Sequence, residues 1–273
     1  MHRTQQSRMN REAFHDLTSR ASSPTLWWMG QMGFLMKLGS TLISIDYYAL
    51  PSENRQIPPP VPAEELDGIS LFFGTHNHSD HMDIPSWKIW LNTCPGARFV
   101  FPRAHQEFLI REGFPEDRLI GLNDGETVQA GEITIHAVAA AHEFLDQDPE
   151  TGLYPCLQYI LECGGKRIYH AGDTLRYEGM LPTLRALGHF DCAILPINGR
   201  DAVRYRANCI GNMTFQESAD LAGELRPGLV IPGHWDMFVS NSADPTAFAD
   251  YLDAKYGPSV PCLIPSYLTP ITL

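Results

Sequence analysis

The most informative segment of the chain reads Thr75-His76-Asn77-His78-Ser79-Asp80-His81-Met82-Asp83, and it directly follows the apolar run from Ile69 to Gly74. Because alternate residues of an extended segment share a face, His76 and His78 can point to one place. Asp80 and His81 come where the chain should turn into a helix, so they can point to a second place beside it. The segment therefore predicts ligands for two metal ions at the end of a buried strand. The alternative is a polar surface loop that happens to be rich in histidine.

The ligand types in this segment narrow the metals that it can bind. Imidazole nitrogens and a carboxylate, without any thiolate, suit Zn, Mn or Fe and argue against a closed structural zinc site. We therefore expect two divalent metal ions as cofactors, with Zn or Mn favoured and Fe allowed. Two such ions would also offset four charges of the net −12 that the chain carries.

The composition is that of an ordinary globular protein. Hydrophobic residues make up 44% and charged residues 19% of the 273 positions, values that allow a sizeable core and argue against disorder. The net charge of −12 argues against an obligate nucleic-acid partner, since phosphate binding needs a basic surface. The expected partner is a small anionic substrate, and a homo-oligomer is allowed.

Cysteine usage and hydropathy bear on the compartment. The six cysteines show no Cys-x-x-Cys spacing, and several lie in apolar runs, as buried free thiols do. The first eleven residues are polar, so no signal peptide is expected, and no apolar run is long enough to span a bilayer. These features predict a cytoplasmic protein that does not associate with membranes.

The order of predicted elements indicates an α/β (α+β) protein. Three strands from 26 to 46 form an antiparallel meander, and the proline-rich excursion 47–68 follows. We interpret this excursion as a wall of the active site, with a plain surface connection as the alternative. Later strands and helices alternate, which predicts a four-layer αββα sandwich with helices on both outer faces. The expected division is an N-terminal extension at 1–24 and a single domain at 25–273.

Two metals need more ligands than one loop supplies, and three later strands each end on a candidate. His142 follows the strand 133–139, Asp173 follows a second strand, and His234 follows a third. Each of these taken alone is more often an ordinary surface or core residue. His136 competes with His142, but His136 lies inside its strand, and we expect metal ligands at strand ends.

With these residues in place, the chain resembles the metallo-β-lactamase-fold hydrolases over nearly all of 25–270. The motif that carries the resemblance is His76-x-His78-x-Asp80-His81 followed by His142, Asp173 and His234. The resemblance implies a first metal at His76, His78 and His142, a second at Asp80, His81 and His234, and Asp173 bridging them. It also implies catalysis by a hydroxide that bridges the metals, with Asp80 or a nearby His relaying the proton.

Within that superfamily, the similarity is closest to the L-ascorbate-6-phosphate lactonase-like branch. The segments that carry it are Trp28-Met29-Gly30-Gln31, Tyr169-His170-Ala171-Gly172-Asp173-Thr174, Asn198-Gly199-Arg200-Asp201, Asn212-Met213-Thr214 and Pro232-Gly233-His234-Trp235-Asp236. This resemblance implies a lactonase acting on an anionic sugar-acid lactone or a related ester. The alternatives are a phosphodiesterase for cyclic nucleotides or short RNA, and a metal-binding regulatory or structural protein without catalysis.

Further residues are candidates for supporting roles. Asp46 ends a β-branched strand and is predicted to orient a metal-bound histidine, with a turn-forming carboxylate as the alternative. His170 could hydrogen-bond a metal-bound water or fill the core. The last candidates form a basic cluster that could anchor a phosphate or carboxylate of the substrate, unless they only form a solvated loop. They are Arg200, Arg204 and Arg206.

Overall fold

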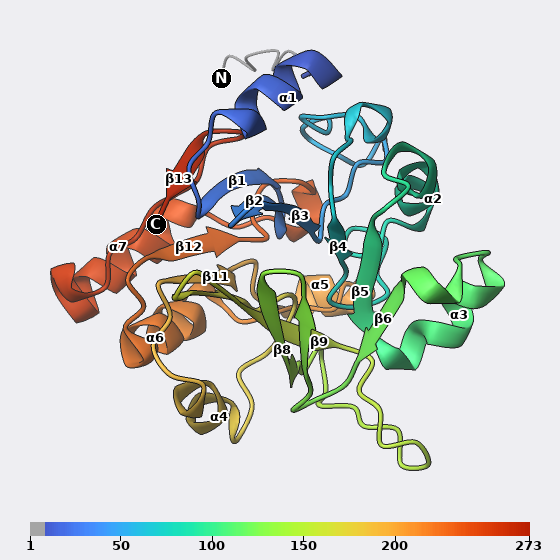
Figure 1. Ribbon diagram of the computed structural model, residues 1–273. Coiled ribbons are helices and arrows are strands. Elements are labelled where there is room, and N and C mark those ends of the chain that lie inside the picture. Colours follow the sequence, from blue (N-terminus) through green and yellow to red (C-terminus); the bar gives the residue numbers. More distant parts are fainter. Residues whose placement is uncertain (1–8) are drawn as a thin grey trace.

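The computed structural model describes residues 9–273 (Figure 1). Residues 1–8, part of the predicted N-terminal extension, lie outside the described residues. The described part of the extension forms α1 (Arg11–Ser19), and the Asn10 side chain caps this helix by accepting from the amide of Ala13 at 3.0 Å. Phe14 of α1 is buried against the rest of the protein, so the extension is packed onto the core.

The first sheet contains seven strands. In spatial order they are β13 (Pro270–Thr272), β1 (Thr25–Gly30), β2 (Gly33–Leu38), β3 (Thr41–Ile45), β4 (Leu71–Phe73), β5 (Arg98–Pro102) and β6 (Leu119–Leu122). The predicted meander is confirmed, because β1, β2 and β3 pair antiparallel in sequence order. From β3 to β6 the pairing is parallel. The carboxyl ends of β3 to β6 therefore lie at one edge of the sheet.

The second sheet contains six strands. In spatial order they are β12 (Val230–Gly233), β11 (Cys192–Pro196), β10 (Lys166–His170), β9 (Leu157–Cys163), β8 (Ile133–Ala139) and β7 (Thr127–Ala130). Strands β10, β11 and β12 are parallel, whereas β7 to β10 are joined as antiparallel neighbours. The parallel strands bring the loops after β10 and β12 to the same edge.

Three apolar layers show that the fold is the predicted four-layer sandwich. Successive residues of one strand point to different layers: Trp28 lies in the core between the two sheets, and Trp27 lies in the core outside the first sheet. The second outer core covers the other sheet and contains Leu184, Leu221 and Phe248. Figure 1 shows the helices on opposite sides of the sheets. They are α2 (Ile84–Thr93) and α3 (Gln106–Arg111) on one side, and α4 (Met180–Ala186), α6 (Phe215–Leu225) and α7 (Pro245–Tyr256) on the other.

Three short segments complete the fold. A 3-10 turn, Arg103–His105, directly precedes α3. A short helix, α5 (Ala202–Arg206), follows β11 in a stretch without predicted structure. The extended tail adds β13 to the edge of the first sheet beside β1. Within residues 9–273 no helix is long and apolar enough to cross a membrane.

Candidate metal centre

Four strand ends bring the candidate ligands together where the two sheets meet. The loop after β4, in the first sheet, carries the segment His76 to His81. His142, Asp173 and His234 follow β8, β10 and β12 of the second sheet. The β4 loop is fixed to the second sheet by a hydrogen bond from the amide of Leu157 to the carbonyl of Thr75, at 2.9 Å. Residues from distant parts of the chain thus share one site.

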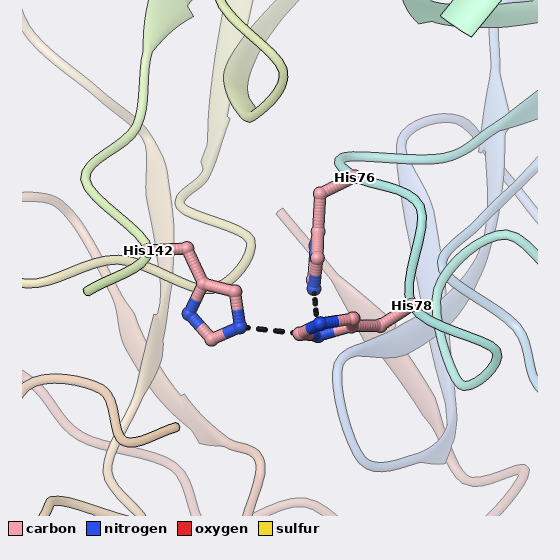
Figure 2. A group of neighbouring side chains, drawn as sticks. All are labelled: His76, His78 and His142. Carbon is pink, nitrogen blue, oxygen red and sulfur yellow. Dashed lines mark hydrogen bonds between the residues drawn. The ribbon is translucent and has the colours of Figure 1, made fainter. Parts of the chain in front are cut away.

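The first group consists of His76, His78 and His142. Figure 2 shows their ring nitrogens pointing toward one another. His76 Nε2 lies 2.9 Å from His78 Nδ1, and His142 Nε2 lies 3.1 Å from the same atom. His136, the competing candidate, lies within β8 and contacts Thr127 Oγ1 at 2.9 Å. The structure therefore brings His142, and not His136, to the other two imidazoles.

The second group consists of Asp80, His81 and His234. Asp80 Oδ2 lies 3.6 Å from His81 Nε2 and 3.7 Å from His234 Nε2. One ligand atom from each of the three residues lies within 4.8 Å of the other two. The group matches the second set of ligands that the sequence predicts.

Asp173 lies between the two groups. Its Oδ1 is 3.4 Å from His81 Nε2, and its Oδ2 is 3.1 Å from His234 Nε2. The same Oδ2 lies 3.9 Å from His142 Nε2, which belongs to the first group. One carboxylate is thereby within reach of both groups, as a bridging ligand must be.

Two buried polar atoms at the centre have no hydrogen-bond partner within residues 9–273, and a bound cation would interact with both. His81 Nε2 and Asp173 Oδ1 are buried and lie 3.4 Å apart, but neither makes a hydrogen bond to any described residue, although buried polar atoms are normally paired. Burial lowers the pKa of His76, His78 and His142, that of His142 to about 4. These imidazoles are therefore neutral at pH 7, the form that binds metals. The donor set fits divalent metal ions.

Comparison with known proteins agrees with this geometry. Residues 44–235 match the Beta-lactamase superfamily domain. The chain belongs to this superfamily. A UPF0173 metal-dependent hydrolase of Thermococcus onnurineus is 30% identical over 218 residues, which cover 80% of this chain and 88% of that protein. The chain is thus a metal-dependent hydrolase of the beta-lactamase superfamily.

Solved structures agree with the fold. A metallo hydrolase from the archaeon Ignicoccus hospitalis superposes with a TM-score of 0.69 at 23% identity, covering 92% of this chain and 99% of that one. An isothiocyanate hydrolase from Delia radicum gut bacteria gives a TM-score of 0.71 at 15% identity, covering 91% of this chain and 99% of that one. At such identities the likeness establishes the fold alone.

Asp46 contacts the Nδ1 atom of His81, a predicted metal ligand. Its Oδ2 lies 2.7 Å from His81 Nδ1, and its carboxylate also accepts from the amide and hydroxyl of Thr75 at 2.9 and 2.7 Å. A carboxylate that holds the Nδ1 proton of a histidine leaves Nε2 free to bind a metal. Asp46 therefore lies where the predicted orienting role requires it.

Both ring nitrogens of His170 are bonded to the backbone and not to a predicted metal ligand. Its Nε2 donates to the carbonyl of Met32 at 2.8 Å, and its Nδ1 accepts from the amide of Gly172 at 3.3 Å. Burial lowers its pKa, so the ring is neutral and both nitrogens are satisfied by the backbone. The contacts indicate that His170 shapes the turn leading to Asp173, and they do not support a hydrogen bond to a metal-bound water.

The arginine cluster is largely committed to the protein itself. Arg200 makes a bidentate pair with the Glu217 carboxylate, at 2.5 and 2.7 Å. Arg204 donates to the carbonyls of Asn198 and Ser242, the latter at 2.7 Å. Arg206 lies exposed on α5. The predicted anchoring of a substrate anion is therefore not supported for Arg200 and Arg204, because their donors already bind protein acceptors.

The Arg200–Glu217 pair gives a pH-dependent prediction. The hydrogen bonds that Arg200 donates to the Glu217 carboxylate hold the pKa of Glu217 below its usual range. Such a carboxyl stabilises the fold above its unfolded-state pKa of about 4.3, and this stability is lost as pH falls through the lower folded-state value. Glu217→Gln keeps the capping box with Thr214 but removes the charge. We expect it to cost about 1 kcal/mol at pH 7 and less at pH 3.

Thermal unfolding of wild type and Glu217→Gln at both pH values measures this difference. A Tm difference that stays constant between pH 7 and pH 3 would contradict the assigned role of the ion pair.

The excursion 47–68 reaches the site, as its interpretation as a wall requires. The amide of Gln56 donates to the carbonyl of Met237 at 2.7 Å, so the excursion is bound to the loop that follows His234. Burial raises the pKa of Tyr48, and the carboxylates of Asp83 and Asp80 raise it further. The amides of Ala49 and Leu50 donate to Asp83 Oδ2, both at 2.9 Å, so the start of the excursion is bound to the loop that carries the predicted ligands.

Proposed function

We propose that the protein is a dinuclear metal-dependent hydrolase that opens a lactone or cleaves a related ester. The observation that carries this proposal is the position of Asp173, whose carboxylate lies within 4 Å of histidines from both ligand groups. Two divalent ions bound there would lower the pKa of water and polarise the scissile carbonyl. Zn or Mn is our proposed metal, with Fe as the alternative.

Asp80 is the proposed proton acceptor. Its side chain is 17% exposed, compared with 4% for Asp173 and 0% for Asp46, so among these carboxylates it is the most accessible to water. Burial would raise its pKa, but His81 and His234 lower it below its usual range. Asp80 is therefore ionised at neutral pH and can accept a proton from the attacking water and pass it to the leaving group.

The choice of a sugar-acid lactone rests on the similarity to the lactonase-like branch. Two of the three arginines proposed to hold the substrate anion are bound to protein groups, so Arg206 is the remaining candidate of that cluster.

All six cysteines are free, which supports our proposal of a reducing, cytoplasmic location. Residues that are distant in the sequence pack in the same hydrophobic cores, which supports our proposal of a single domain at 25–273.

Parallel assays separate the proposed reaction from phosphodiester hydrolysis. The purified protein, loaded with Zn or Mn, is tested on a panel of γ- and δ-lactones that includes sugar-acid lactones, and on bis(p-nitrophenyl) phosphate. Metal-stripped protein is the control. We expect metal-dependent lactone opening at least 100-fold faster in kcat/KM than phosphodiester cleavage. Faster phosphodiester cleavage would instead favour the phosphodiesterase alternative.

A further inference from the structure

Gln31 lies at the tip of the hairpin between β1 and β2 and is fully buried. Its amide donates to Asp236 Oδ1 at 2.8 Å, and its carbonyl accepts from the amide of His234 at 3.0 Å. The neighbouring carbonyl of Met32 accepts from His170 at 2.8 Å. The hairpin tip of the first sheet is thereby fixed to the loop after β12, which carries His234, and to the end of β10, which leads to Asp173.

The backbone of Gln31 has φ of 56°, in the left-handed region that disfavours most side chains. The contacts that fix the turn use only its main-chain atoms, and glycine could make them with less strain. What glutamine adds at this position is its side chain, so the contacts of the carboxamide decide what Gln31 does.

The carboxamide points into the second ligand group. Its Nε2 lies 3.3 Å from Asp80 Oδ2 and 3.4 Å from His234 Nε2. Its Oε1 is buried and has no hydrogen-bond partner among residues 9–273. An amide donates to a carboxylate without adding the positive charge that lysine or arginine would bring beside a metal. An unpaired buried acceptor costs stability, so packing alone does not account for a glutamine at this position.

We propose that Gln31 is a positioning residue for the second metal. Its Nε2–H donates to Asp80 Oδ2 and holds this carboxylate facing His81 and His234. The inference rests on the metal site of the proposed function, and it is independent of the substrate. Loss of partners that orient metal ligands typically weakens metal binding about 10- to 100-fold.

Two variants test the role. Gln31→Met keeps the length of the side chain but has no donor. Gln31→Asn tolerates positive φ and stays polar, but it is one methylene too short to keep the contact with Asp80. We expect either variant to bind the second metal, at Asp80, His81 and His234, about 10- to 100-fold less tightly than wild type. The stoichiometry at limiting free metal should fall from two to one, and kcat should fall more than KM rises.

Gln158→Met is the matched control. Gln158 is also fully buried, but its carboxamide bonds to the carbonyl of Ala139 and the hydroxyl of Tyr169, outside the ligand groups. We expect this variant to lower Tm without changing metal affinity.

Chelator competition and elemental analysis of the folded proteins measure the affinities, independently of turnover. Wild-type affinity for both metals in Gln31→Asn or Gln31→Met would overturn the inference. A wild type that binds two metals but hydrolyses no lactone would contradict the proposed function alone, because the comparison of metal affinities would still be valid.

Discussion

Asp173→Ala is expected to lose both metal binding and turnover. The two carboxylate oxygens of Asp173 face His81 and His234 at 3.4 and 3.1 Å, and His142 at 3.9 Å. Removing the carboxylate takes a ligand from both groups at once and leaves the histidines without a counter-charge. We expect kcat/KM to fall at least 1,000-fold, about 4 kcal/mol of transition-state stabilisation. Elemental analysis and steady-state kinetics on the same preparation measure the two losses together.

Asp173→Asn separates charge from shape, because it keeps the volume of the side chain. It should lose metal almost as severely as the alanine variant. Asp191→Asn is the control, since Asp191 follows α4 and bonds to Lys166 and the amide of Arg167, away from the site. It should retain metal and activity. Full activity in Asp173→Ala would refute the dinuclear mechanism.

Metal removal is expected to destabilise the wild-type protein strongly. The buried Asp46 and Asp173, together with Asp80, lie among five histidines, and bound divalent cations would balance the charge of these carboxylates. An ion present at 1,000 times its Kd stabilises the folded state by about 4 kcal/mol. In a chain of this size that corresponds to a Tm shift of roughly 10 °C.

Thermal unfolding with and without a chelator such as dipicolinate measures this shift, and added Zn or Mn should reverse it. Asp173→Ala provides the control, because a protein that binds no metal should not respond to the chelator. An unchanged Tm in chelated wild type, with metal loss verified by elemental analysis, would contradict the structural dependence on cations.

The sequence was most informative where local pattern determines structure. Where His or Asp follows an apolar strand, the sequence predicted that its side chain lies at a strand end. Residues that follow a strand lie at its end in any order of the strands within the sheet. The capping box of Thr214 and Glu217 at the start of α6 is likewise a signal carried by the spacing of two nearby residues. Both signals are contained within a few residues.

Features that depend on distant contacts were not predictable in this way. Gln31 approaches Asp80 because a hairpin of the first sheet reaches the loops of the second, and no local pattern encodes that approach. Arg200 looked available to a substrate because its partner, Glu217, lies on a different element. Helix α5 was missed because its five residues are too few to show helical periodicity.

Anomalous diffraction from crystals of the metal-loaded protein tests the central claim most directly. We predict two peaks per chain. The first should lie about 2.1 Å from the imidazole nitrogens of His76, His78 and His142. The second should lie at bonding distance from Asp80, His81 and His234, with Asp173 bonded to both metals. A single peak, or peaks bonded to other residues, would contradict the dinuclear site.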